Sequence, residues 1–106
     1  MEKKYTLVFD EVMIQQLKKA AKNNHIKKIL TALLDKLELA GPYTGKLLDS
    51  KLSLYEIKNM HPPIRLYFKY NRETNEIFVF EFEMKTSREK QENTLNKIKN
   101  KIRLKP

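Results

Sequence analysis

The sequence lacks cysteine altogether, holds only two glycines and has no long apolar run. Without cysteine the chain forms neither disulfides nor thiolate metal sites, which favours a cytoplasmic setting. The first apolar run, residues 5–9, is too short for the core of a signal peptide or for a membrane span. We therefore expect a soluble cytoplasmic protein with no membrane partner. The 106 residues predict one domain, residues 1–106, around a single core.

Acidic residues are few, since 13 Asp and Glu stand against 22 Lys and Arg and the net charge is +9. The excess is concentrated in the last twenty residues, which carry seven basic and two acidic side chains. Concentrated positive charge attracts polyanions and speeds their encounter. The same excess is also typical of a surface that only keeps a protein soluble. Charge therefore indicates a nucleic-acid partner only in combination with a binding site.

The first half of the chain predicts a strand followed by two helices. Residues 5–9 are β-branched and aromatic, which favours a strand, and Asp10 is a plausible cap for a helix that runs to Asn23. A wide apolar stripe predicts a second helix over residues 26–39. The short link between the helices indicates a helical hairpin on one face of a sheet. Residues 46–51 are expected to form a connector.

The second half predicts three strands and a final helix. The strands are LYEIK at 54–58, IRLYFKY at 64–70 and IFVFEFEMK at 77–85. Thr86 and Glu89 have the spacing of a capping box, and a narrow apolar stripe follows in a basic helix. The predicted fold class is α+β with the element order β-α-α-β-β-β-α. An antiparallel sheet would carry the helical hairpin on one face, with the basic helix at the C-terminus.

Alternation along the strands predicts what each face of the sheet carries, because successive side chains point to opposite sides. The face on the helical hairpin should carry Ile64, Leu66, Phe68, Tyr70, Phe78, Phe80 and Phe82. The other face should be partly open to solvent and carry Lys58, Arg65, Tyr67, Lys69, Ile77, Val79, Glu81, Glu83 and Lys85. An exposed row of cations and an aromatic ring suits an anionic, base-bearing ligand, and RNA fits that description best.

Three motifs between residues 54 and 88 resemble a known family. They are Leu54-Tyr-Glu-Ile-Lys58, Ile64-Arg-Leu-Tyr-Phe68 and a hydrophobic strand that ends in Met84-Lys85-Thr86 before a basic helix. In this order and with these gaps they are similar to the RelE/HigB toxins of the RelE/ParE superfamily. The resemblance in element order extends over nearly the whole chain. Family members are toxins of toxin–antitoxin modules that inhibit translation by cutting messenger RNA in the ribosomal A site.

The resemblance implies catalytic residues and a reaction that needs no metal or other cofactor. The ribose 2′-hydroxyl attacks the adjacent phosphate, and Arg65 matches the arginine that stabilises charge on that phosphate. Lys58 matches a basic residue that helps the hydroxyl lose its proton or steadies the developing charge. Lys85 matches the basic end of the last strand. Four further residues are expected to contact the RNA: Lys51, Tyr67, Lys69 and Arg88.

These residue types suit the chemistry. Preorganised cations stabilise the negative charge that builds on phosphate oxygens in the transition state, and one arginine fork can hold two of those oxygens. Glu81 and Glu83 add negative charge beside the cations. Either one of them holds Lys85 or Arg65 in place, or one acts as a carboxylate base, with Glu56 as the other candidate base, or they weaken catalysis. The chain ends without the Tyr or His that many relatives use, so the acid that protonates the leaving oxygen is unassigned.

The family also implies a partner, a cognate antitoxin of acidic or amphipathic character. Two other functions are consistent with the sequence: a ParE-like toxin that inhibits gyrase, and a non-catalytic RNA-binding protein. A plain structural explanation also exists. Arg65 and Lys69 are then part of a solvated sheet face, with cross-strand ion pairs that contribute roughly 0.2–1 kcal/mol each.

Overall fold

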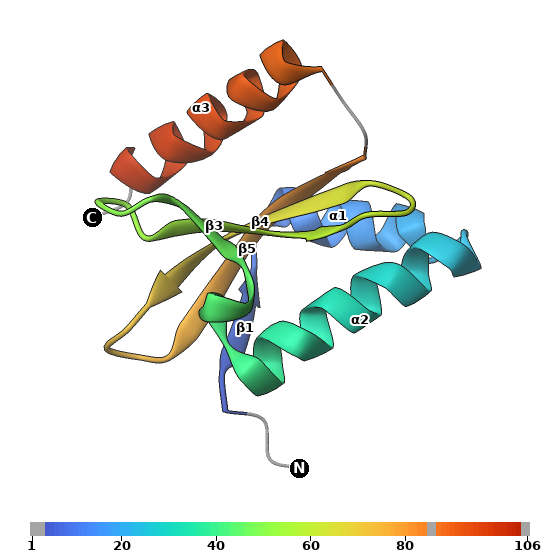
Figure 1. Cartoon of the computed structure of the whole chain (residues 1–106), viewed down its shortest axis with the longest axis horizontal. Coiled ribbons are helices and arrows are strands. Elements are labelled where there is room, and N and C mark those ends of the chain that lie inside the picture. The colour runs from blue at the N-terminus through green and yellow to red at the C-terminus, as the bar shows by residue number, and fades with distance from the viewer. Residues whose placement is uncertain (1–3, 85–86, 105–106) are drawn as a thin grey trace.

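A five-stranded sheet with helices on both faces forms the described part of the chain, residues 4–84 and 87–104 of a computed structural model (Figure 1). In chain order the elements are β1 (Thr6–Phe9), α1 (Glu11–Ala20), α2 (Asn24–Ala40), the short 3-10 helix η1 (Pro42–Thr44), β2 (Lys46–Asp49), β3 (Leu54–Asn59), β4 (Ile64–Asn71), β5 (Glu76–Met84) and α3 (Arg88–Leu104). The strands lie in the order β1-β5-β4-β3-β2. β1 runs parallel to β5, and the other neighbours are antiparallel.

The predicted α+β class and the order of the predicted elements are confirmed, with two differences. Residues 46–49 form strand β2 where a connector was predicted, and the parallel pairing of β1 makes the sheet mixed. β2 lies close against β3 because residue 45 is a glycine: a Cβ atom there would stand 2.4 Å from the carbonyl oxygen of Glu56. Parallel neighbours need a long crossover connection, and here the two helices and three strands lie between β1 and β5.

Two polar side chains set where the two helices of the hairpin begin. Asp10 caps α1 as predicted, and its carboxylate accepts a hydrogen bond from the Val12 amide at 3.0 Å. α1 ends at Ala20 and not at Asn23, because Asn23 caps the second helix. The side-chain oxygen of Asn23 accepts hydrogen bonds from two amides in the first turn of α2, at 3.1 and 3.2 Å.

The helical hairpin packs on one face of the sheet and encloses the larger core (Figure 1). Its buried side chains are Met13, Ala20, Leu30, Leu33, Leu37, Tyr55, Ile57, Ile64, Leu66, Phe68, Ile77 and Val79. The apolar side of β4 therefore faces α1 and α2, as its alternation predicted.

The opposite face of the sheet was predicted to be partly open to solvent, and α3 packs on part of it (Figure 1). The narrow apolar stripe of α3 supplies Ile98 and Ile102, with Leu95 at its margin. The buried cluster on this side consists of Leu54, Tyr67, Phe80, Ile98 and Ile102. The sheet is thus the middle of three layers, and only the parts of this face that α3 leaves uncovered can meet a ligand.

A β-bulge in β5 explains why some predicted facings are wrong. The register between β4 and β5 shifts next to the Tyr67–Glu81 pair, where β5 has one extra residue, Phe80. Residues before the shift therefore change faces relative to a regular strand. Four residues lie on the face opposite to that predicted, Ile77 and Val79 in the hairpin core and Phe78 and Phe80 on the α3 side.

The side chain of Gln16 occupies the edge of β5 beyond the end of β1. Its amide nitrogen donates to the carbonyl of Phe82 and its amide oxygen accepts from the Phe82 N–H, each at 2.9 Å. One side chain thus satisfies the two backbone groups that a neighbouring strand would otherwise pair.

Among the described residues, three ion pairs join α3 to the sheet, two of them at its opposite edges. Three lysines of α3 pair with carboxylates: Lys97 with Glu81 at 3.0 Å, Lys99 with Asp49 at 3.6 Å and Lys101 with Asp10 at 3.1 Å. Asp10 follows β1 and Asp49 ends β2, and these strands are the opposite edges of the sheet. Much of the positive charge predicted to attract polyanions is therefore engaged within the protein.

The start of α3 is capped by Ser87, whose hydroxyl accepts a hydrogen bond from the Lys90 amide at 3.1 Å. The predicted capping residue Thr86 lies outside the described residues, as does Lys85.

Tyr67 lies at the centre of the contact between α3 and the sheet and is fully buried. Its hydroxyl donates to one oxygen of Glu83, and the hydroxyl of Thr94 on α3 donates to the other, both at 2.8 Å. Burial, followed by the bond to Glu83, raises the pKa of Tyr67 well above its ordinary value. The prediction that Tyr67 is exposed to a ligand is wrong, because α3 covers its ring.

Replacing Ile98 tests how strongly α3 is docked. We expect Ile98→Ala to lower the free energy of unfolding by about 2–5 kcal/mol, because a fully buried side chain is truncated. Leu104→Ala is the matched control: this residue is 82% exposed, and its truncation should change stability by less than about 0.5 kcal/mol. Urea denaturation measures both, and equal effects of the two variants would contradict the docked position of α3.

Tyr67→Phe removes only the hydroxyl. It should lower the free energy of unfolding by about 1.5–3 kcal/mol at neutral pH, as is usual on losing a hydrogen bond to a charged group. Folding raises the pKa of Tyr67, so this contribution is complete below the ordinary tyrosine pKa of about 10 and is lost as the pH rises toward the folded value. Denaturation at a series of pH values should show the free energies of unfolding of the two proteins beginning to converge only above the ordinary tyrosine pKa of about 10. Tyr43→Phe, at a largely exposed ring, is the control.

Candidate functional site

Two rows of polar side chains cross β3, β4 and β5 on the face that α3 partly covers. One row consists of Glu56, Tyr67 and Glu81, and the next of Lys58, Arg65 and Glu83. Residues directly opposite one another in antiparallel strands share a face, with Cβ atoms about 4.5–5.5 Å apart. The predicted residues Lys58 and Arg65 are therefore neighbours, and Lys58 is exposed.

A buried carboxylate holds the guanidinium group of Arg65. Its Nη1 atom lies 2.9 and 3.2 Å from the two carboxylate oxygens of Glu56. The Glu56 side chain is 4% exposed, whereas that of Arg65 is 37% exposed. One nitrogen therefore anchors the arginine against the sheet, and the planar group retains further N–H donors for a ligand at the surface.

The carboxylates around Arg65 make the site nearly balanced in charge. Glu56 is paired with Arg65, and Glu83 accepts from two hydroxyls. Glu81 is buried, and its Oε1 atom lies 3.0 Å from the ammonium of Lys97 without the alignment of a hydrogen bond. Each of the three carboxylates thus has a partner within the described part of the chain. Glu56, predicted only as a candidate base, holds Arg65 in place, a role predicted for Glu81 or Glu83.

Arg88 begins α3 and lies beyond the end of β5, where Met84 pairs with the neighbour of Arg65, Ile64. Its side chain is 93% exposed and stands 3.7 Å from Glu92. Such a loose pair on the surface leaves the guanidinium available to a ligand. The third predicted catalytic residue, Lys85, lies outside the described residues.

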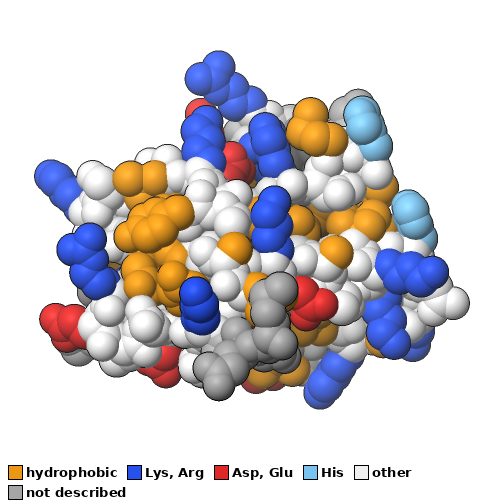
Figure 2. Space-filling model, turned by 60° about the horizontal axis from the view of Figure 1, so that its bottom comes forward, with side chains coloured by type: hydrophobic (Ala, Val, Ile, Leu, Met, Phe, Trp, Pro, Cys, Tyr) orange, Lys and Arg blue, Asp and Glu red, His pale blue; other side chains and the backbone are white. Residues whose placement is uncertain are grey.

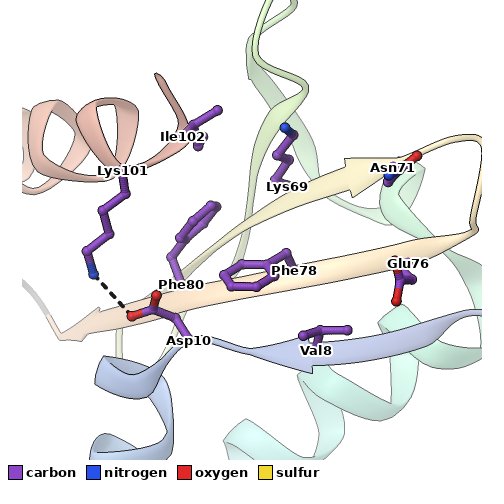
Figure 3. Close-up of a pocket in the computed structure, with 9 residues that line it drawn as sticks. All are labelled: Val8, Asp10, Lys69, Asn71, Glu76, Phe78, Phe80, Lys101 and Ile102. Atoms are coloured by element: carbon purple, nitrogen blue, oxygen red, sulfur yellow. Dashed lines mark hydrogen bonds and ion pairs between the residues drawn. The ribbon is translucent and has the colours of Figure 1, made fainter. Parts of the chain in front are cut away.

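Lys51 and Lys69 lie at the other end of the sheet from Arg65. Lys69 follows Arg65 by four residues along β4, which corresponds to about 13 Å. It lines a groove of about 350 Å³ between α3 and the strands, where Phe78 and Phe80 form an apolar floor and Lys101 pairs with Asp10 (Figure 3). Lys51 is exposed in the turn before β3, whose first residue pairs with Lys69. The predicted RNA contacts therefore fall into two separate groups.

Some residues of the site were not predicted from the sequence. Thr94 and Lys97 of α3 contact Glu83 and Glu81, and their spacing of three residues places them on the same side of a helix. That spacing was the available signal, but it does not say which strand the helix faces. Lys and Arg side chains are also spread over the face seen in Figure 2, with fewer acidic side chains among them.

Residues 4–84 and 87–104 contain no group of three or more His, Asp or Glu side chains arranged to hold a metal ion. In the same ranges, no helix has the length and apolar character needed to cross a bilayer.

Solved structures of RelE proteins share this fold. A chain of the intact E. coli RelBE toxin–antitoxin complex is 25% identical, with a TM-score of 0.59 over 79% of this chain and 99% of that chain. A free E. coli RelE mutant with two arginines changed to alanine is 21% identical, with a TM-score of 0.67 over 89% of this chain and 97% of that one. A chain of the RelBE2 toxin–antitoxin complex of Mycobacterium tuberculosis is 19% identical, with a TM-score of 0.56 over 76% and 98%.

No protein-family profile and no curated protein sequence matches the chain. The relationship is therefore visible in the arrangement of helices and strands and not in overall sequence. The chain has the fold of RelE toxins, and the RelE resemblance predicted from residues 54–88 is confirmed at that level.

Proposed function

We propose that this protein is the toxin of a toxin–antitoxin pair and that it inhibits translation by cleaving messenger RNA in the ribosomal A site. The observation that carries the proposal is the position of Arg65. It is anchored by a buried carboxylate, partly exposed, and adjacent to Lys58 on a sheet with the RelE fold. A second cation beside a fixed arginine is the arrangement that a phosphodiester needs at its non-bridging oxygens.

The reaction that fits these residues is an attack of the ribose 2′-hydroxyl on the neighbouring phosphorus. The new O–P bond closes a 2′,3′-cyclic phosphate, and the bond to the 5′-oxygen breaks. The 2′-hydroxyl loses its proton and the leaving oxygen gains one. Arg65 stabilises the charge on the phosphate oxygens, and Lys58 either helps remove the first proton or stabilises the same charge. Neither role requires a metal ion.

Glu56 has a positioning role in this proposal. A carboxylate that is 3% exposed and contacts one edge of the guanidinium fixes where its other N–H groups point. Such pre-orientation lowers the barrier because the arginine need not be ordered during the reaction. The same ion pair neutralises part of the charge of Arg65, so the site relies on geometry more than on net charge.

Other contacts with the RNA follow from position. Arg88 is exposed at the same end of the sheet as Arg65, and we assign it to the RNA strand near the cleaved bond. Lys85 stays a predicted third catalytic cation, on the resemblance alone. Lys69 and Lys51 lie at the far end, so we assign them to a more distant part of the RNA or of the ribosome. Tyr67 is not available for stacking while α3 covers it.

The proposed partner is a cognate antitoxin of acidic or amphipathic character. Similar chains occur in toxin–antitoxin complexes, and the E. coli RelE mutant was also solved in complex with an antitoxin peptide. The net charge of +9 favours an acidic partner.

Replacing Arg65 tests the proposed reaction. We expect Arg65→Ala to reduce cleavage of a translated messenger RNA by about 100- to 1,000-fold, the usual loss on removing one stabilising donor. Arg65→Lys should recover little of it, because an ammonium cannot form the same fork. Primer extension on messages from a reconstituted translation system gives the cleavage rate.

Arg72→Ala, which removes an exposed arginine from the turn after β4, is the matched control and should cleave normally. If Arg65→Ala and Arg72→Ala are equally active, the proposed mechanism is wrong. Breaks in DNA without cuts in RNA would instead support gyrase inhibition. RNA binding without any cleavage by the unmodified protein would support the non-catalytic alternative.

Replacing Glu56 separates positioning from charge. Glu56→Ala should lower kcat by up to about 100-fold because the guanidinium is no longer held in place. It should also tighten RNA binding, since a negative charge has been removed from the site. Glu56→Gln keeps one acceptor oxygen, so its kcat should lie between that of Glu56→Ala and that of the unmodified protein. A parallel loss of binding and turnover, with unchanged thermal stability, would refute the positioning role.

A further inference from the structure

A second cationic site lies next to Arg65, at the edge of the sheet formed by β2. Lysines from three different elements line a pocket of about 260 Å³: Lys36 of α2, Lys46 of β2 and Lys58 of β3. Thr44 and Gly45, from the end of η1 and the turn after it, complete the wall together with Glu56 and Ile57.

The pocket is a consequence of how β2 meets β3. β2 begins at Lys46, which pairs with Glu56, whereas β3 continues to Asn59. The last residues of β3 therefore have no partner on the β2 side, and the sheet is notched there. Gly45 leads the chain into β2 in close contact with the β3 backbone, which leaves the notch open beyond it.

Unlike Lys97, Lys99 and Lys101 of α3, the lysines of this pocket have no counter-ion among the described residues. Within residues 4–84 and 87–104, no carboxylate lies within ion-pair distance of Lys36, Lys46 or Lys58. The one acidic residue in the lining, Glu56, is already paired with Arg65. Three like charges gathered around one pocket repel one another, and an anion that enters it relieves this repulsion.

The pocket continues the row that contains Arg65. Lys46 is opposite Glu56 and Lys58 is opposite Arg65, so both lysines share a face of the sheet with the arginine. Lys46 and Lys58 are diagonal neighbours, for which a separation of about 7–8 Å is usual. Cations therefore follow one another from β4 across β3 to β2, and Lys36 reaches the same pocket from α2.

We propose that Lys36 and Lys46 bind the backbone phosphate next to the one held by Arg65 and Lys58, so that single-stranded RNA leaves the reaction site across the edge strand β2. The assignment of the first phosphate to Arg65 rests on the proposed function, but the charge and shape of the pocket do not. The groove in Figure 3 is a weaker candidate for this part of the RNA, because its Lys101 is paired with Asp10.

The test is the salt dependence of binding to an RNA oligonucleotide that is methylated at every 2′-oxygen and so resists cleavage. Each phosphate contact of a single strand contributes about 0.7 to the slope of log affinity against log salt. We expect Lys36→Ala/Lys46→Ala to bind more weakly, with a slope shallower by about 0.7, because the two lysines contact one phosphate. Lys36→Arg/Lys46→Arg keeps both charges and should restore binding.

The matched control is Lys27→Ala/Lys28→Ala, which removes two exposed lysines from α2 away from the pocket. Equal slopes for the two alanine pairs would overturn the pocket assignment, since only the total charge would then matter. The cleavage assay of Arg65→Ala separates this outcome from failure of the proposed function. Cleavage that survives Arg65→Ala rejects the reaction site, whereas loss of cleavage together with equal slopes rejects only the pocket.

Discussion

The ion pair between Arg65 and Glu56 is the interaction on which the rest of the site depends. A carboxylate buried between strands costs several kcal/mol unless a cation stands beside it, and Arg65 is the cation that the neighbouring strand supplies. The pairing fixes one edge of the guanidinium in the protein and leaves the remainder of the side chain at the surface. β3 and β4 thus determine both where the arginine lies and which way it points.

The lysines of the chain fall into two groups according to their partners. Lys97, Lys99 and Lys101 of α3 pair with carboxylates, the last two at opposite edges of the sheet, so the most basic segment of the sequence serves mainly to fasten a helix over a largely apolar cluster. Those around the notch beside β2 have no such partner in the described ranges. Net charge along the sequence therefore overstates the cationic surface near α3 and understates it at the notch beside β2.

Much of the fold could be predicted because its elements have local signals. The alternation along β4 and the capping side chain of Asp10 each determine structure within a few residues. The bulge at Phe80 had no such signal. From Ile77 to Phe80, successive side chains of β5 are all apolar, so aromatic rings are buried whichever of the two alternating sets faces the helical hairpin. The strand β2 is short, and its pairing depends on the close approach at Gly45. The partners of Arg65 and Lys97 depend on register and helix placement, which only the assembled sheet defines.

The contact between Gln16 and Phe82 has a consequence for how copies of this protein meet. A sheet with two bare edges invites another chain to extend it, and long-lived aggregates grow in that way. Here a glutamine amide fills the stretch of β5 that extends beyond β1, so an added strand is discouraged there. The outer sides of β1 and β2 remain the edges of the sheet, and a strand from a second copy would have to pair with one of them.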